Sequence, residues 1–201
     1  MGNIAGCFDG HAHVFHRDLP MAPNRRYAPQ SDASLEAYDA LLRSCGLDGG
    51  ILVQPSSLGS DNGFLFDTLN EAARFPDLTF KRVVVFDPYG EAWQTDLETA
   101  EQAGIIGIRR NLVGAPDQSL DLNPWHHILE AVARRGWHVE LHCEGERFAL
   151  DTVREPAGLH RGFGLAVRMV GTSNRDPRVS TNFPTQSLQE WRIRRNPPSI
   201  R

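Results

Sequence analysis

Residues 8–15, Phe-Asp-Gly-His-Ala-His-Val-Phe, place two histidines one residue apart at the end of a short apolar run. If that run is a β-strand, side chains two residues apart point to the same face of the sheet. His11 and His13 are then neighbours that can share one ion or one substrate. Parallel β/α barrels keep their chemistry at the carboxyl ends of their strands, so this pair predicts the first half of an active site.

The composition is that of an ordinary globular protein. The chain has 201 residues, of which 40% are hydrophobic and 23% charged, and this length can bury a core of its own. No apolar run approaches the roughly 18 residues that a membrane helix needs, and the N-terminus has no basic-then-apolar signal pattern. The three cysteines show no paired spacing. We therefore expect a cytoplasmic protein with no membrane partner and no disulfide framework.

The net charge of −4 hides an asymmetry along the chain. Residues 1–150 hold 21 acidic and 12 basic side chains, a balance of −9, whereas residues 151–201 hold 4 acidic and 9 basic ones, a balance of +5. The basic part has no cluster longer than residues 192–195 and no interleaved aromatic side chains. Nucleic acid is therefore not an expected partner.

Short β-branched runs alternate with helix-like stretches up to about residue 147. The helix-like stretches show apolar residues at helical spacing and end at glycine or proline. This alternation predicts parallel βαβ units with right-handed crossovers. The predicted strands cover residues 4–8, 50–54, 80–86, 105–109 and 137–141, and the predicted helices cover 34–45, 61–75, 95–103 and 124–135.

Polar and titratable residues gather at the carboxyl end of each predicted strand. The first strand is followed by His11 and His13, the fourth ends in Arg109, and the fifth is followed by His142. Chance would spread such residues over both ends of the strands. Their collection at one end is expected of a barrel with its active site at that mouth. The second and third strands contribute Gln54, Ser56 and Asp87.

These motifs resemble the amidohydrolase superfamily, and more narrowly the branch that contains 2-pyrone-4,6-dicarboxylate lactonase and related sugar-lactone enzymes. Asp-Gly-His-Ala-His at 9–13, together with His142, carries the broad resemblance. The motifs cover about residues 7–146 in the expected order. The narrower resemblance rests on Pro-Asn-Arg-Arg-Tyr-Ala-Pro at 23–29, Gln-Pro-Ser at 54–56, Gly-Ser-Asp-Asn at 59–62 and Gly-Ile-Arg at 107–109.

The resemblance implies a (β/α)₈ barrel of the TIM-barrel type that hydrolyses a lactone, or a similar carbonyl substrate, carrying carboxylates. The implied catalytic residues are His11, His13 and His142. In metal-dependent members the His11–His13 pair binds one divalent ion, zinc or manganese, which lowers the pKa of bound water. In the lactonase branch the same histidines polarise the carbonyl without a metal, so the cofactor stays open.

The resemblance also implies a set of substrate-binding residues. Arg109 suits a carboxylate because its planar guanidinium pairs both carboxylate oxygens. The small-molecule substrate is therefore expected to carry carboxylates. The implied binding residues are Arg109, Tyr27 and Ser56.

The chain departs from the family pattern after residue 147. A barrel of eight units needs roughly 250 residues, and the sequence predicts only five. The expected fold class is therefore α/β, a partial barrel over residues 1–147 followed by an irregular segment rich in arginine and proline at 148–201. His160 stands close before Gly-Phe-Gly but follows no apolar strand. No counterpart of the family's eighth-strand aspartate is visible, and Asp176 lies in a loop-like context.

Several alternatives stay open at this point. The irregular segment could come from a frameshift or premature end in a gene for a longer enzyme, which its arginine-rich, lysine-free composition favours, or it could be a native C-terminus or a regulatory tail. A five-stranded sheet has unpaired edges, so the chain could be an inactive fragment or could associate with itself. A metal-dependent amidohydrolase or decarboxylase is a further alternative. Each candidate site residue also has a purely structural alternative: His11 and His13 as a structural pair, Arg109 as a surface residue, His142 as a core residue and Ser56 as a turn residue.

Overall fold

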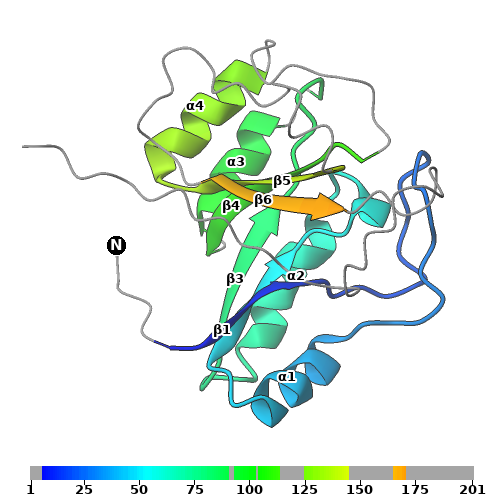
Figure 1. Ribbon diagram of the computed structural model, residues 1–201, viewed down its shortest axis with the longest axis vertical. Coiled ribbons are helices and arrows are strands. Elements are labelled where there is room, and N and C mark those ends of the chain that lie inside the picture. Colours follow the sequence, from blue (N-terminus) through cyan, green and yellow to red (C-terminus); the bar gives the residue numbers. More distant parts are fainter. Residues whose placement is uncertain (1–5, 91–92, 103, 114–124, 145–164, 171–201) are drawn as a thin grey trace, which may run out of the picture. The chain divides into compact units, whose positions relative to one another are not determined.

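The computed structural model describes residues 6–90, 93–102, 104–113, 125–144 and 165–170 (Figure 1). The chain divides into two compact units, residues 1–109 and residues 110–201. In the first unit strands alternate with helices, as the sequence predicts. Its elements are β1 (Phe8–Ala12), α1 (Leu35–Ser44), β2 (Gly49–Val53), the 3₁₀ turn η1 (Ser56–Leu58), α2 (Gly63–Ala72), β3 (Thr79–Val84), α3 (Trp93–Gln102) and β4 (Ile105–Asn111), which continues two residues into the second unit.

The strands of the first unit form a parallel sheet in the order β1-β2-β3-β4. Figure 1 shows β1, β2 and β3 side by side. Gly50 of β2 lies opposite Asp9 of β1 and Phe80 of β3, and Val83 of β3 lies opposite Gly107 of β4. Parallel neighbours joined by a helix are βαβ units, so the prediction of parallel βαβ units is confirmed.

Helix α1 begins and ends close to where its sequence predicts. The Ser34 hydroxyl accepts a hydrogen bond from the Ala37 amide at 3.2 Å, which caps the first turn. Gly46 follows the helix with a φ of 66°, a conformation that glycine adopts without strain. The buried face of the helix packs on the sheet, where the Tyr38 ring lies 6.2 Å from that of Phe80.

A buried arginine lies between β3 and α2. The Arg82 side chain is 2% exposed, and its Nε donates to the Leu65 carbonyl and to the Thr68 hydroxyl, both at 3.2 Å. Burial lowers the pKa of Arg82 to about 10. The guanidinium therefore stays charged at neutral pH and bonds α2 to the sheet.

The second unit contains α4 (Trp125–Arg135), β5 (His138–Glu144) and β6 (Leu165–Val170). β5 and β6 run parallel, with Val139 opposite Leu165. The Arg110 guanidinium lies 4.0 Å from the centre of the Trp125 ring, a cation–π contact that holds α4 against the end of β4. None of the helices in the described ranges is long and apolar enough to cross a membrane.

The first strand lies further along the chain than predicted. The sequence predicts a strand at residues 4–8, with the histidines after it, whereas β1 begins at Phe8 and His11 lies inside it. The predicted end at residue 8 is therefore wrong. The pairing of β1 with β2 shifts register between Asp9 and Ala12, and this irregularity lets the strand continue through Gly10.

The segment after residue 147 holds one described element. β6 is a strand that the sequence does not predict, because its apolar residues show neither clean alternation nor flanking turn signals. The remainder of residues 148–201, including His160 and Asp176, lies outside the described residues. The domain boundary at residue 147 stays a prediction.

An exposed ion-pair network joins α1 to the turn before β3. Arg43 donates from Nε to Asp39 at 2.7 Å and from Nη2 to Asp77 at 2.9 Å. Hydrogen bonds from Arg43 lower the pKa of Asp77 to about 2 from its usual 3.8. A carboxylate with a depressed pKa stabilises the folded state above its unfolded pKa, and this contribution is lost as the pH falls through the folded value.

Replacing Asp77 by asparagine should therefore make the free energy of unfolding less dependent on pH in the acid range. Between about pH 4 and pH 2 the wild-type chain should lose more stability than Asp77→Asn does, because only the wild type has this carboxylate to protonate. The difference should be small, since the pair is exposed. Urea unfolding at stepwise pH measures it, and parallel pH curves for the two proteins would contradict the assignment.

Candidate active site

His11 and His13 meet ring to ring. Their Nε2 atoms are 3.3 Å apart, and their ring centroids are 4.8 Å apart at an interplanar angle of 81°. Both side chains are half-buried. The prediction that the two histidines are neighbours is therefore confirmed.

The backbone of β2 orients the His13 ring. His13 Nδ1 lies 2.7 Å from the Val53 carbonyl oxygen. Because a carbonyl oxygen only accepts hydrogen bonds, Nδ1 carries the hydrogen, and in the neutral imidazole Nε2 then carries the lone pair. A bond of this kind fixes the tautomer and direction of a working histidine. The His13 lone pair is thus directed to the place where His11 Nε2 also lies.

The separation of the two Nε2 atoms fits one tetrahedral ion. Zinc–nitrogen bonds of 2.0–2.1 Å at a tetrahedral angle separate two nitrogens by about 3.3–3.4 Å, and the observed separation is 3.3 Å. Within the described ranges no group of three or more histidine, cysteine, aspartate or glutamate residues could hold a metal. The pair therefore offers two metal ligands, and it equally fits a shared proton or one substrate oxygen.

Arg109 reaches the same end of β2 as His13. Its Nη1 donates to the Gln54 carbonyl at 3.2 Å, and its side chain is 3% exposed. The alternative that Arg109 is a surface residue is therefore wrong. His13 and Arg109 are bonded to consecutive carbonyls, those of Val53 and Gln54. The His13 imidazole and the Arg109 guanidinium are thus both anchored at the carboxyl end of β2.

Two buried side-chain amides hold the segment between β2 and α2. Gln54 Nε2 donates to the Asp61 carbonyl at 2.7 Å. Asn62 donates to the Val85 carbonyl at 2.8 Å and accepts from the Val85 amide at 3.1 Å. The sequence pattern places Gln54 at the mouth of the predicted site but does not predict that either amide holds this segment; for Gln54, a polar amide directly after an apolar strand is the signal that could have revealed it. Together they fix η1 beside the site.

Ser56 and Tyr27 lie on two loops that touch each other. Ser56 begins η1 and is half-buried. Tyr27 lies on the long loop between β1 and α1, residues 16–32, which we call the excursion. Two backbone hydrogen bonds between Phe15 and Ala33, of 2.8 and 2.9 Å, join the two ends of this loop, its neck. The Ala22 amide donates to the Ser57 carbonyl at 2.8 Å and joins this excursion to η1. Tyr27 is 51% exposed, and its hydroxyl makes no hydrogen bond to another described residue.

His142 lies on β5 in the second unit. The sequence predicts that it follows a strand ending at residue 141, but β5 continues to Glu144, so that predicted end is wrong. The pairing with β6, in which His142 lies opposite Arg168, extends the strand. The His142 carbonyl accepts from the Leu112 amide at 2.7 Å, and its side chain is half-buried. Its catalytic role stays a prediction.

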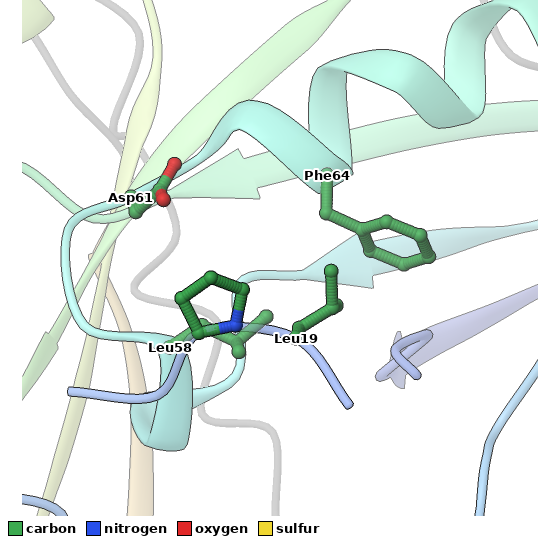
Figure 2. Close-up of a pocket in the computed structure, with 5 residues that line it drawn as sticks. Leu19, Leu58, Asp61 and Phe64 are labelled. Atoms are coloured by element: carbon green, nitrogen blue, oxygen red, sulfur yellow. The ribbon is translucent and has the colours of Figure 1, made fainter. Parts of the chain in front are cut away.

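A small pocket lies between the excursion and the β2–α2 segment (Figure 2). Its volume is about 50 Å³, whereas small-molecule sites usually measure at least about 300 Å³. It is therefore too small for a lactone with two carboxylates and belongs to the packing of the two loops. The lining residues are Leu19, Pro20, Leu58, Asp61 and Phe64.

A family model described as amidohydrolase matches residues 8–176. This chain belongs to the amidohydrolase family. The match begins at the first residue of β1, includes both histidines of the pair, and extends beyond residue 147 through β6. The resemblance inferred from the motifs is therefore confirmed.

Two curated relatives are similar to this amidohydrolase. One is 2-pyrone-4,6-dicarboxylate hydrolase of Comamonas testosteroni, which is 30% identical over 147 residues, 70% of this chain and 44% of the relative. The other is 4-sulfomuconolactone hydrolase of Rhizobium radiobacter, 30% identical over 106 residues, 52% of this chain and 33% of the relative. The chain thus spans less than half the length of either.

Two solved structures share the fold of this amidohydrolase. The first, described as a probable 2-pyrone-4,6-dicarboxylic acid hydrolase of Acinetobacter baumannii with citric acid bound, matches with a TM-score of 0.67 and 29% identity over 80% of this chain and 57% of its own. The second, from Pseudomonas putida, carries the same provisional name and matches with a TM-score of 0.65 and 35% identity over 81% of this chain and 56% of its own. The chain therefore has the fold of a partial TIM barrel.

Proposed function

We propose that this amidohydrolase hydrolyses a lactone that carries carboxylate groups. The observation that carries the proposal is the anchoring of His13 and Arg109 to the consecutive carbonyls of Val53 and Gln54 at the end of β2, with His11 Nε2 3.3 Å from His13 Nε2. Such an arrangement offers a site for a carbonyl oxygen beside a site for a carboxylate. The named activities of the two curated relatives, a pyrone dicarboxylate hydrolase and a sulfomuconolactone hydrolase, support a substrate of this class.

The histidine pair acts on the scissile carbonyl in this proposal. Negative charge develops on the carbonyl oxygen when water attacks, and preorganised donors stabilise that charge. One proton held between His11 Nε2 and His13 Nε2 can be donated to this oxygen, while the bond from Nδ1 to Val53 keeps the His13 ring in place. His142 is proposed as a third catalytic histidine.

Arg109 binds a substrate carboxylate in this proposal. Its guanidinium is buried, and charge-assisted hydrogen bonds are stronger where water is excluded. Tyr27 and Ser56, on the two joined loops, are proposed as hydroxyl donors to the substrate's carboxylates. The citric acid bound to the Acinetobacter baumannii relative is itself a carboxylate ligand, which supports this class of substrate.

The proposal is tested by assaying the purified 201-residue chain with 2-pyrone-4,6-dicarboxylate. Ring opening removes the pyrone absorbance, and a pyrone without carboxylates is the matched control. We expect turnover of the dicarboxylate and little of the control. A folded chain that turns over neither would overturn the proposal and favour the inactive fragment.

Replacing Arg109 by glutamine should raise KM about 10- to 150-fold, because a hydrogen bond to a charged group contributes about 1.5–3 kcal/mol. The kcat should change little, since Arg109 is proposed to bind the substrate and not the reacting carbonyl. Arg110→Gln is the matched control, because Arg110 stacks on Trp125 instead, and its KM should stay within about twofold. An unchanged KM for a folded Arg109→Gln would refute the anchoring role.

A metal-dependent amidohydrolase or decarboxylase is the second candidate. The specific observation in its favour is the Nε2–Nε2 separation of 3.3 Å, which matches two ligands of one zinc ion. A bound zinc or manganese ion would supply an activated water there. Equilibrium dialysis with zinc distinguishes the candidates: about one ion per chain, lost in His11→Asn, supports the metal, and equal binding by both proteins contradicts it.

Location and self-association belong to the same proposal. We expect the protein to act in the cytoplasm, which fractionation of the producing cells can test. Among the described residues of the first unit β1 pairs with β2 alone, and an unpaired strand edge can pair with another chain. Sedimentation velocity tests this proposed self-association, and a strictly monomeric chain at every concentration would contradict it.

A further inference from the structure

The backbone of β1 carries a bulge at the histidine pair. Asp9 lies opposite Gly50 and Ala12 lies opposite Leu52, so three steps along β1 span only two steps along β2. One extra residue is therefore inserted between Asp9 and Ala12. A bulge locally disrupts the ladder of hydrogen bonds and re-aims the neighbouring side chain.

A side chain also bonds the backbone in this bulge. The backbone N–H of His11 donates to Asp9 Oδ1 at 3.2 Å. The Asp9 carboxylate thus holds the backbone at the residue whose side chain enters the site. The path of the chain through His11 depends on where this carboxylate is held.

Tyr38 of α1 holds the second oxygen of the same carboxylate. Its hydroxyl donates to Asp9 Oδ2 at 3.0 Å, and its side chain is 7% exposed. Burial, followed by the charge of Asp9, raises the pKa of Tyr38 well above its usual value. The phenol therefore remains protonated and remains a donor.

Gly50 provides the space through which Tyr38 reaches Asp9. A β-carbon at residue 50 would lie 1.9 Å from the Tyr38 hydroxyl oxygen and 2.7 Å from its Cζ. Gly50 is also the residue opposite Asp9 in the sheet. Because residue 50 has no side chain, the Tyr38 phenol of α1 can pass over β2 and reach the Asp9 carboxylate of β1.

We propose that Asp9 and Tyr38 are positioning residues, which set the direction of the His11 side chain by holding the bulged backbone of β1. His13 is oriented through its own ring, by Val53; His11 is oriented through its backbone, by Asp9. The proposal rests on the proposed lactone hydrolysis only for its kinetic consequence, because the geometric consequence exists without any substrate.

The experiment compares Tyr38→Phe with the wild-type 201-residue chain by two independent readouts. The first is the set of imidazole ¹⁵N signals of His11 and His13, assigned by single histidine replacements. The second is turnover of 2-pyrone-4,6-dicarboxylate. We expect the His11 signals to shift or broaden while those of His13 stay in place, and kcat to fall at least about tenfold at unchanged KM, as for a misaligned reacting group.

Thr68→Val is the matched control, because it removes a different buried hydroxyl. That hydroxyl donates to the Leu65 carbonyl at 2.6 Å, within α2. It should lower the melting temperature without changing the His11 signals or kcat. Asp9→Asn is the second variant should Tyr38→Phe fail to fold. An amide oxygen can still accept from the His11 amide, so Asp9→Asn should keep more activity than Asp9→Ala.

The two readouts separate this proposal from the proposed function. Unmoved His11 signals in a folded Tyr38→Phe, with only the melting temperature lowered, would overturn the positioning role. Shifted His11 signals in a chain that hydrolyses no lactone would support the positioning role and reject the proposed function. Equal activity of Asp9→Asn and Asp9→Ala would overturn the claim that an acceptor at this position is what matters.

Discussion

Replacing His13 by asparagine is expected to lower kcat for the lactone by about a hundredfold to a thousandfold, the usual cost of removing one preorganised group at a developing oxyanion. The asparagine amide can keep the bond to the Val53 carbonyl, because it places a donor near the position of Nδ1. It has no atom at the position of Nε2, which faces His11 at 3.3 Å. The loss should therefore affect turnover and leave the fold intact.

The measurement combines pyrone turnover with a thermal melt. His16→Asn is the matched control, because His16 is exposed and lies 3.6 Å from Asp32 at the neck of the excursion. That variant should keep kcat within about twofold, as expected for a surface change. An undiminished kcat in a folded His13→Asn would remove His13 from the mechanism.

Replacing Gly49 by alanine is expected to destabilise the first unit by about 3 kcal/mol or more, at the upper end of the cost of overpacking. The new β-carbon would lie 1.9 Å from the Thr79 carbonyl oxygen and 2.7 Å from the Phe8 ring. The carbonyl belongs to the backbone opposite Gly49 in the β2–β3 pairing. Two paired strands cannot move apart by this distance and keep their hydrogen bonds.

Urea unfolding of both proteins measures the difference. Gly90→Ala is the matched control, because a β-carbon at residue 90 would meet its nearest atoms at 3.5 Å, an ordinary contact distance. Its stability should lie within about 0.5 kcal/mol of the wild type. A free energy of unfolding for Gly49→Ala that lies less than about 1 kcal/mol below that of the wild type would show that β2 and β3 are not paired as the structure has them.

The elements that the sequence predicts well are those specified by local patterns. The apolar spacing of α1, with Ser34 before it and Gly46 after it, marks both ends of the helix within its own residues. The closeness of the His11 and His13 rings is likewise expected from their spacing of two residues at a strand end, although β1 ends at Ala12, between them. Such rules need no knowledge of which strand pairs with which.

The features that the sequence does not predict depend on partners far along the chain. The bulge in β1 is a mismatch with β2, so the predicted strand at residues 4–8 misses it. Arg109 is separated by 55 residues from the carbonyl that it bonds. Tyr38 reads as one apolar residue of a helix face, because its acceptor, Asp9, belongs to another element. Strand pairing and side-chain hydrogen bonds between distant residues are set by tertiary packing and have no signature in the local sequence.

The closeness of the Val53 and Gln54 carbonyls along the backbone has a consequence for the proposed choice of substrate. His13 is bonded to the carbonyl of Val53 and Arg109 to that of Gln54, so only the two backbone dihedral angles of Gln54 lie between the two anchoring carbonyls. A motion of one loop cannot carry the imidazole away from the guanidinium unless β2 itself deforms. In the proposed function, the short backbone path between these two anchors selects lactones by the distance between the ring carbonyl and the acid group.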